Sequence, residues 1–415
     1  MKKVLATILA LAMAIGLCSV SWADATTEVK TEAELTTAVS NGGEIKLGAN
    51  ITLTSMLTIP ADKTVTLDLN GLSITSAGKV IKNNGILTIT DTKGGGKIIS
   101  TGNTAVGVGD NSKTTIKTAI IESVEGAVIT GYATGATINI EDGIFSASDN
   151  AVVAGNGNRT NEAGAERTVG NTINISGGTF NGQIKTPTYV ACGIYAPWKD
   201  TIKVTGGTFN ITGGAGIVAR AGNVTVTNAV FNTTGNATGK VGDSRVVVPC
   251  SAIVFDSEAA YPALTNTAAI SVESGTFTSE ADAISVVKPE GEGAAERVSV
   301  TGGTFSTDVT GYLGEGKILQ KNGDTYTAVT NSGITSGTYT AKPTVPDGYK
   351  VVENTDGTFT VEKVGGYYYY YPTTDTKTTD TKGSPKTFDA GIALYVGMAL
   401  TSAAGVAFVG KKRED

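Results

Sequence analysis

Short alternating segments dominate the pattern of hydrophobic and polar positions along this chain. Residues 173–180, INISGGTF, alternate apolar and polar side chains, turn through small residues and end on an aromatic residue, as a β-strand with a tight turn does. Close variants of this phrase begin at residues 203, 271 and 299, and looser variants begin at residues 138 and 224. The repetition predicts a series of equivalent strands.

A second column of residues lies between these copies, where a small residue precedes a branched aliphatic one. The shortest step along this column, from Val106 to Val128, is 22 residues, and the longer steps add an inserted loop to a coil of about that size. Self-similarity at such a period is typical of a solenoid. The column comprises Val106, Val128, Val152, Ile194, Ile217, Ile253 and Ile284.

The period of two within each segment decides which solenoid to expect. Helical repeats would need apolar residues three and four positions apart, whereas here Thr, Val, Ile and Ser alternate throughout. We therefore predict an all-β fold, a right-handed single-stranded parallel β-helix, with like residues stacked at the strand spacing of ~4.8 Å. The aliphatic column and the Phe column should fill its interior. The β-helix with its C-terminal cap should span residues 44–329.

The inserted loops follow two rows. Residues 155–170, 256–266 and 289–296 each separate an aliphatic-column strand from the next GGTF-type strand, and residues 181–189 and 233–248 precede aliphatic-column strands. Insertions that line up on one face of a repeat protein often carry its binding function. They are also tolerated simply as drift at surface turns.

The N-terminus reads as an export signal followed by a short helix. Residues 1–23 hold a basic start at Lys2 and Lys3, an apolar run and a small-x-small site before Asp24, as in a secretory signal peptide. Residues 24–43 contain the capping-box spacing of Thr31 and Glu34. We expect an amphipathic helix there that caps the open end of the solenoid.

The C-terminal part predicts attachment to the cell surface. After a small β appendage, with a turn signal at Asp356-Gly357, the chain continues through a Tyr/Thr/Asp/Lys spacer to 21 uncharged residues, ~30 Å as a transmembrane helix. The basic tail places the preceding chain outside the cell. The segments are the appendage at 330–363, the spacer at 364–383, a sorting-like motif at 384–389, the transmembrane helix at 390–410 and a cytoplasmic charged tail at 411–415.

Composition excludes several kinds of chemistry. The chain has no histidine, which removes Ser-His-Asp catalysis and every histidine-containing metal site. Its net charge of −6, without a basic stripe, argues against nucleic acid as a partner. Cys192 and Cys250 should lie about two coils apart, too far for a disulfide. We expect no cofactor, no metal and no catalytic residue.

Residues 384–389 resemble the sorting signal of Gram-positive cell-wall proteins, a Leu-Pro-x-Thr-Gly pentapeptide before an apolar span and a basic tail. The match rests on Pro385, Lys386 and Thr387, whereas Ser384 replaces the leucine and Phe388 the glycine. The resemblance implies cleavage after Thr387 by a sortase and linkage to peptidoglycan. The alternative is a retained membrane anchor.

The coils are similar to the pectate-lyase-like superfamily of right-handed β-helices. The GGTF repeats and the units NGDTYT and DGTFTV resemble large repetitive surface proteins of anaerobic Gram-positive bacteria. The resemblance implies an exported adhesin or binding rod that engages glycans or the surfaces of a host or neighbouring cell. Tyr195 and Trp198 are the candidate ligand contacts, because exposed aromatic rings provide stacking surface for sugars.

An enzyme is the alternative interpretation, because many β-helices are polysaccharide lyases or glycoside hydrolases. A lyase of this fold needs an Arg or Lys base beside carboxylates, and a hydrolase needs converging carboxylates. Asp200 and Arg220 could lie on adjacent coils and form such a pair, although one such pair is more often a surface salt bridge. No adjacent Asp-Asp and no Gly-His-Gly is present.

Overall fold

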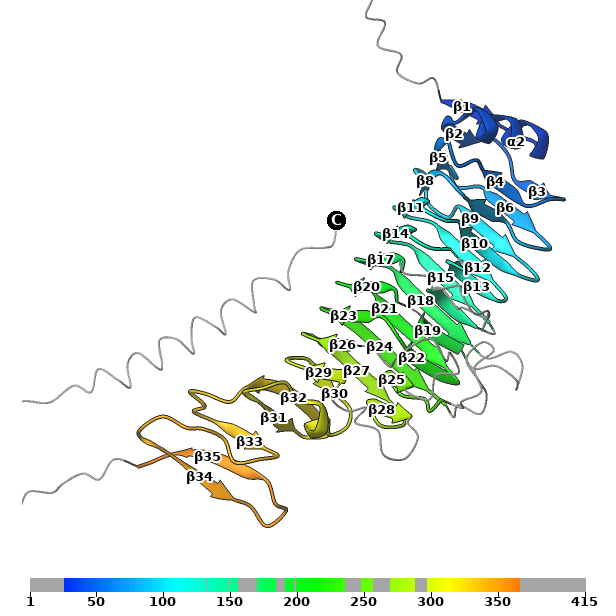
Figure 1. Cartoon of the computed structure of the whole chain (residues 1–415). Coiled ribbons are helices and arrows are strands. Elements are labelled where there is room, and N and C mark those ends of the chain that lie inside the picture. Colours follow the sequence, from blue (N-terminus) through cyan, green and yellow to red (C-terminus); the bar gives the residue numbers. More distant parts are fainter. Residues whose placement is uncertain are drawn as a thin grey trace, which may run out of the picture. The chain divides into compact units, whose positions relative to one another are not determined.

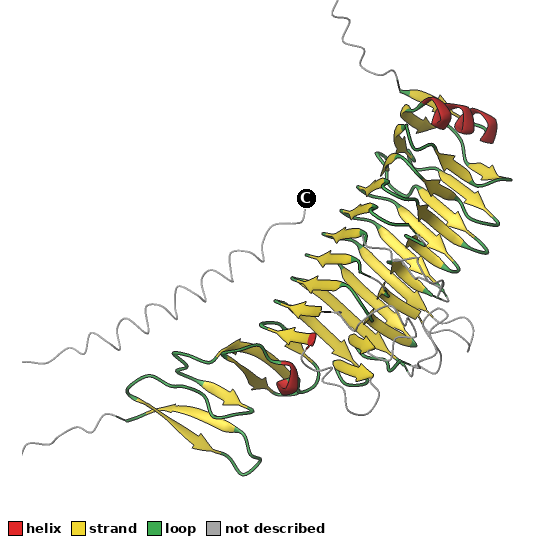
Figure 2. Cartoon of the chain, viewed as in Figure 1, coloured by secondary structure: helices red, strands yellow, loops and turns green. Residues whose placement is uncertain are grey.

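The computed structural model describes residues 26–131, 133–148, 150–155, 170–183, 191–197, 199–235, 248–256, 269–287 and 297–365. The chain divides into two compact units, residues 1–364 and 365–415, and the described strands all belong to the first. This unit is almost entirely β-structure, with its strands stacked in long parallel sheets (Figure 1 and Figure 2). The arrangement is consistent with the predicted β-helix solenoid.

Within the described residues the strands form three sheets, and each coil contributes one strand to each sheet in turn. Sheet A begins each coil and sheet B follows it. Sheet A contains, in stacking order, β1 (Thr27–Val29), β2 (Gly43–Leu47), β5 (Thr64–Asp68), β8 (Ile86–Thr90), β11 (Lys113–Ile116), β14 (Thr137–Ile140), β17 (Thr172–Ile175), β20 (Thr201–Val204), β23 (Asn223–Val226), β26 (Ala269–Val272) and β29 (Val298–Val300).

Sheet B holds the strands that end the GGTF-type phrases, and sheet C holds the aliphatic column. The parallel part of sheet B contains β3 (Ile51–Leu53), β6 (Ser73–Ser76), β9 (Lys97–Ser100), β12 (Ile120–Ser123), β15 (Ile144–Ala147), β18 (Thr179–Gln183), β21 (Thr208–Thr212), β24 (Ala229–Thr234), β27 (Gly275–Ser279) and β30 (Thr304–Phe305). Sheet C contains β4 (Leu57–Ile59), β7 (Ile81–Asn83), β10 (Thr104–Val108), β13 (Gly126–Ile129), β16 (Ala151–Ala154), β19 (Ala191–Ala196), β22 (Gly214–Ala219), β25 (Ile253–Asp256) and β28 (Ile284–Val287).

The predicted Phe column is confirmed as a stack of rings on the inward face of sheet B. Adjacent rings lie nearly parallel, with interplanar angles from 7° to 11° and centroids from 4.3 to 5.5 Å apart. Such ring pairs stabilise a core beyond the area that they bury. In the first coils isoleucines take the same inward positions in register. The stacked residues are Phe145, Phe180, Phe209, Phe231, Phe277 and Phe305.

The aliphatic column in sheet C is confirmed except at one coil. Val106 pairs with Val128, and Ile194, Ile217, Ile253 and Ile284 follow in register. Between them Val128 pairs with Val153, and Val153 pairs with Ile194, so the assignment of Val152 to the column was wrong. Both valines of β16 are fully buried, so hydrophobicity alone does not distinguish them.

The predicted N-terminal helix is present as α2 (Glu32–Asn41), with Thr31 as its N-cap. The Thr31 hydroxyl accepts a hydrogen bond from the Glu34 amide at 3.3 Å, and the Glu34 carboxylate accepts one from the Lys30 amide at 2.7 Å. The helix contacts β1, β2, β3 and β4. Its buried side chains are Leu35, Ala38 and Val39.

Antiparallel strands continue sheet B beyond the last parallel coil. The hairpin of β31 (Lys317–Asn322) and β32 (Thr325–Thr330) pairs with β30, and Gly323 and Asp324 form its tight turn. Beyond it lie β33 (Gly337–Tyr339), β35 (Phe359–Lys363) and β34 (Tyr349–Glu353), and a 3₁₀-helix, η2 (Thr310–Tyr312), precedes β31. Leu319 and Ala328 of the hairpin belong to the solenoid core.

No helix in the part of the chain that the structure describes is long and apolar enough to cross a membrane. The predicted transmembrane span at 390–410, the sorting-like motif and the signal peptide lie outside the described residues.

Candidate functional site

The longest insertions all connect to strands of sheet C. Residues 156–169, 257–268 and 288–296 follow β16, β25 and β28, on the way to sheet A. Residues 184–190 and 236–247 precede β19 and β25, on the way from sheet B. The two predicted rows of insertions therefore start from the two opposite ends of the sheet C strands. The insertions themselves lie outside the described residues.

The outward side chains of sheet C change character where the insertions begin. Thr58 of β4 is exposed, and Lys82 and Gly107 on the next two coils are half-buried. From β16 to β25 the corresponding side chains are buried and form an apolar cluster separate from the main core. The cluster contains Ala151, Ala154, Cys192, Tyr195, Ala215, Val218, Val248 and Val254.

A buried ion pair lies at the end of these strands. The Arg220 Nη2 atom lies 2.7 Å from Asp256 Oδ2, and Arg220 Nε donates to the same oxygen at 2.8 Å. The exposed fractions of the two side chains are 2% and 0%. Arg220 Nη1 also donates to the Tyr195 hydroxyl at 3.0 Å, and its guanidinium lies 5.6 Å from the Tyr195 ring centroid. Three consecutive coils are joined by this cluster.

Asp200 lies in a second buried polar cluster. Its Oδ1 atom accepts hydrogen bonds from the amide of Asn171 at 2.8 Å and from Asn171 Nδ2 at 2.9 Å. Asn171 in turn bonds Ala133 and Ala136, so these contacts connect neighbouring coils. Among the ion pairs of the described residues, Arg220 is paired with Asp256. The suggested pair of Asp200 and Arg220 stays a prediction.

The pairing of Arg220 with Asp256 was missed although the sequence contains a signal for it. The segments GIVAR and AIVFD align at Ile217 and Ile253, and the register pairs Ala219 with Phe255. The next position on each coil is Arg220 on one and Asp256 on the other. Side chains at equivalent positions of adjacent coils are close neighbours.

Of the two candidate ligand contacts, the structure describes Tyr195 and not Trp198. Tyr195 has an exposed fraction of 7% and its hydroxyl is bonded to Arg220, so its ring is not the exposed stacking surface that the sequence suggested. Trp198, like Ser384, Pro385, Lys386, Thr387 and Phe388, lies outside the described residues. The roles assigned to those six residues stay predictions.

The two cysteines of the solenoid are buried thiols, and no disulfide joins them. Cys192 lies on β19 and Cys250 just before β25, with β22 between them, which confirms the predicted separation of two coils. The Cys192 thiol donates to the carbonyl of Ile194 at 2.8 Å, and burial raises its pKa to about 12. This thiol is protonated at neutral pH and therefore inert as a nucleophile.

Comparisons with models of protein families, with curated proteins and with solved structures found no match for this chain. Within the described residues, no three His, Cys, Asp or Glu side chains are grouped closely enough to hold a metal ion.

Proposed function

We propose that this protein is a non-catalytic adhesin, a β-helical binding rod displayed on the cell surface. The observation that carries the proposal is the pair of insertion rows that start from the two ends of the sheet C strands. Binding residues of proteins are found disproportionately on loops that a rigid scaffold holds in place. The stacked coils are such a scaffold, and the insertions lengthen some of its coils and not others.

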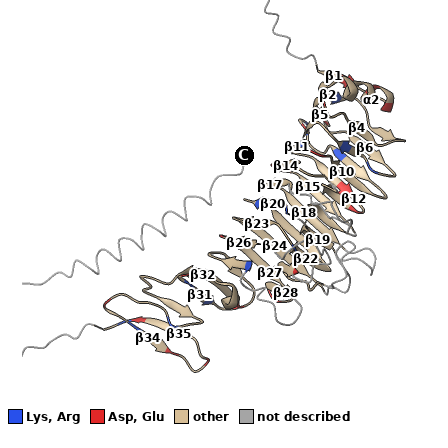
Figure 3. Cartoon of the chain, in the orientation of Figure 1, with Lys and Arg blue, Asp and Glu red and all other residues tan. Residues whose placement is uncertain are grey.

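Burial of the charged groups supports binding over catalysis. A catalytic base or acid must come within hydrogen-bonding distance of its substrate. Asp200 and Arg220, the candidates for a lyase or hydrolase, are at most 2% exposed, and so is Asp256, the ion-pair partner of Arg220. Figure 3 shows the remaining charges as scattered positions along the described strands, which also disfavours nucleic acid as a partner.

Display at the surface is proposed from the sequence. The signal peptide would direct export, and the motif at 384–389 would be cleaved by a sortase and joined to peptidoglycan, unless the span at 390–410 is retained in the membrane. We propose right-handed winding, the usual hand of parallel crossovers. We also propose that α2 caps the first coil, because Leu35 and Val39 are fully buried.

The ligand we propose is a glycan of a host or neighbouring surface. Trp198 is the preferred contact, because it directly follows β19 and Pro197 at an end of a sheet C strand, where the insertion rows start. An aromatic ring there would stack on a sugar. Burial of Tyr195 against Arg220 leaves it a supporting role.

The test is a combined binding and degradation screen of residues 24–363 against host and plant polysaccharides. Retention of a polysaccharide without unsaturated uronate or new reducing ends is expected. Trp198→Ala should weaken binding to the retained glycan, whereas Ile86→Ala, which changes a 46% exposed residue on sheet A, should not. Product formation from any polysaccharide would establish the alternative, a polysaccharide lyase or glycoside hydrolase.

A further inference from the structure

Two β units of similar sequence follow one another at the C-terminal end of the described chain. Each begins with a Gly-Thr-aromatic phrase, GTF in the first and GTY in the second, and continues into an antiparallel hairpin. In the first unit β30 pairs with β32, so that Phe305 lies opposite Tyr326. In the second unit β33 pairs with β35, so that Tyr339 lies opposite Phe359. The second unit is therefore a structural repeat of the first.

The outer strand of the first unit, β31, shows what the free side of such a unit binds. The first strand of the second unit, β33, lies antiparallel along it, with Lys321 opposite Thr338. The Thr340 amide donates to the Leu319 carbonyl at 3.1 Å. One unit thus accepts the Gly-Thr-aromatic strand of the next through backbone groups of its outer strand.

The strand β34 has the place of β31 in the second unit, and no described strand lies on its outer side. It is the last strand of sheet B, with β35 as its neighbour. The Gly348 carbonyl accepts a hydrogen bond from the Val364 amide, on the side of β35, at 2.8 Å. Alternate residues of an antiparallel strand face the same neighbour, so the backbone groups of Val351 and Glu353 point away from β35. These groups are paired with no described strand.

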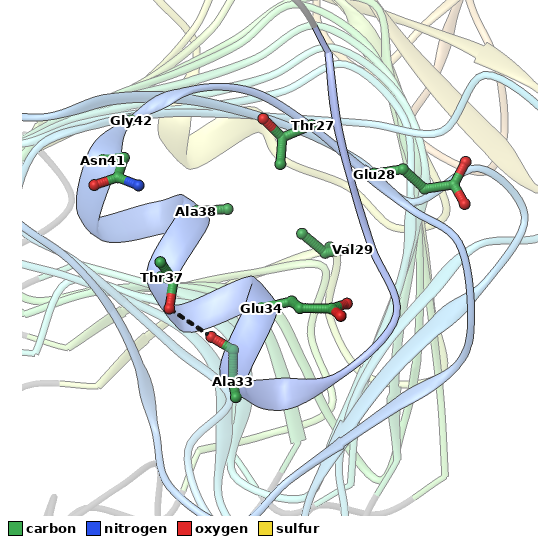
Figure 4. Close-up of a pocket in the computed structure, with 9 residues that line it drawn as sticks. All are labelled: Thr27, Glu28, Val29, Ala33, Glu34, Thr37, Ala38, Asn41 and Gly42. Carbon is green, nitrogen blue, oxygen red and sulfur yellow. Dashed lines mark hydrogen bonds between the residues drawn. The ribbon is translucent and has the colours of Figure 1, made fainter.

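The two ends of the described stack differ in how their strand edges are protected. At the N-terminal end α2 contacts the first strands of all three sheets. Figure 4 shows Val29 of β1 and Ala38 of α2 pointing into the space between these two elements. A covering helix, a proline or a bulge is among the features by which proteins prevent strand addition. The five residues of β34 include no proline and pair with β35 without a bulge, so this edge is open to a further strand.

We propose that the outer side of β34 binds a Gly-Thr-aromatic strand of a partner protein, antiparallel, as β31 binds β33. Val351 and Glu353 take the roles of Leu319 and Lys321, which lie at the corresponding places in the first hairpin. A second copy of this chain has no such strand to offer, because β18, β21, β27, β30 and β33 each have neighbours on both sides. Backbone hydrogen bonds provide the affinity when an extended peptide joins the edge of a sheet.

The side chains of β34 suit such a neighbour. In β31 the position opposite the aromatic residue of β33 is Gln320, and its counterpart in β34 is Val352, which is half-buried. An aromatic ring of the partner lies beside a β-branched side chain there, which is a favourable cross-strand pair. Lys350 is exposed, but its Nζ atom lies 3.0 Å from Glu362 Oε2, so the hairpin itself balances this charge.

The test is binding of a fluorescent peptide with the sequence of residues 336–342, SGTYTAK, to residues 24–364, which hold the first compact unit. Fluorescence anisotropy should show saturable binding. Val351→Pro should weaken it by about tenfold or more, because proline removes the N–H group that points to the partner. An edge strand tolerates proline at such a position, so the fold should persist. Val351→Thr is the matched control, because it keeps the N–H group and should bind as the unaltered chain does.

A second measurement alters the peptide and leaves the protein unchanged. Within the chain the Thr340 amide bonds β31, so the amide of Tyr339, one residue earlier, faces β35. A peptide N-methylated at the position of Thr340 should therefore lose about tenfold in affinity, because it lacks a backbone donor. N-methylation at the position of Tyr339 is the matched control and should have a much smaller effect.

Absence of binding, equal binding by the two Val351 variants, or equal binding of the two methylated peptides would overturn the proposal. Two further results would do the same. Binding to the chain that ends at 364 but not to one that ends at 389 would assign the edge to residues 365–389 of the same molecule. A dimer that Val351→Pro abolishes would assign the edge to a second copy. None of these results depends on a glycan, so the polysaccharide screen judges the proposed function separately.

Discussion

Each glycine two positions before a stacked Phe has a backbone conformation that disfavours a side chain, and it lies too close to the preceding coil to leave room for one. Gly207 has a φ of +98°, and a Cβ atom there would lie 3.2 Å from both the Gly178 carbonyl oxygen and a ring carbon of Phe180. Residues with a Cβ atom rarely adopt this backbone conformation, because it costs them about 1–2 kcal/mol. The looser repeat reaches the same turn differently, since Asn228 takes a φ of 54° and exchanges hydrogen bonds with Ser274.

At the same scale, the buried ion pair predicts a large stability effect. Arg220→Met should lower the free energy of unfolding by about 3–5 kcal/mol, because it leaves the Asp256 carboxylate buried without its main partner. Urea unfolding followed by circular dichroism measures the change. The double variant Arg220→Met with Asp256→Leu should recover much of the loss, because both charges are then removed. A double variant no more stable than the single one would contradict this account.

At the scale of elements, Glu32 fastens α2 to the first coil. Its carboxylate accepts hydrogen bonds from the amides of Ser55 and Thr54 at 3.0 and 2.8 Å. The Ser55 bond is the main reason that the pKa of Glu32 is lowered from its ordinary 4.5. A lowered pKa means that the carboxylate stabilises the folded state above pH 4.5, and that this stabilisation is lost as the pH falls through the lowered value.

We therefore expect amide protection in α2 to fall as the pH drops below about 4.5, beyond the intrinsic change of exchange rate with pH. Hydrogen exchange between pH 6 and pH 3 measures it. Glu32→Gln should show weaker protection at pH 6 and no acid step. Glu44→Gln, an exposed change on β2, is the control and should keep the step. An acid step that persists in Glu32→Gln would assign the transition to another group.

For the whole molecule, the C-terminal end of the stacked coils, at β30, determines which C-terminal truncations are tolerated. The hairpin β31–β32 covers Phe305 and adds Leu319 and Ala328 to the main core, whereas β33, β34 and β35 pack around a small separate cluster. A chain that stops at Thr330 retains the hairpin. A chain that stops at Phe305 exposes the last Phe ring and an unpaired strand edge, which promotes aggregation.

The prediction compares these two truncations by size-exclusion chromatography and binding of a hydrophobic dye. The chain ending at Thr330 should remain monodisperse and bind little dye. The chain ending at Phe305 should aggregate or bind the dye strongly. Equal behaviour of the two would mean that the hairpin does not protect the end of the solenoid.

Local pattern alone was enough for the repeat, the Phe column and the first helix. The alternation around Phe180 and Phe209 predicts inward and outward faces because a strand has a side-chain period of two. Thr31 and Glu34 predict the start of α2 because capping depends on residues three positions apart. These features depend on short sequence distances, which the chain displays directly.

Only the tertiary structure decided two kinds of feature. These are the register between strands of neighbouring coils and the burial of a side chain by residues far away in the sequence. Val152 and Val153 look alike in sequence, and only pairing with Val128 and Ile194 selects Val153. Tyr195 looks like an exposed ring until Arg220, 25 residues later, is seen to bond its hydroxyl. Insertions of different length separate the coils, so neighbours in space are not at a constant distance along the chain. The physical reason is that burial and charge pairing are properties of contacts between coils, whereas strand and turn are properties of each coil by itself.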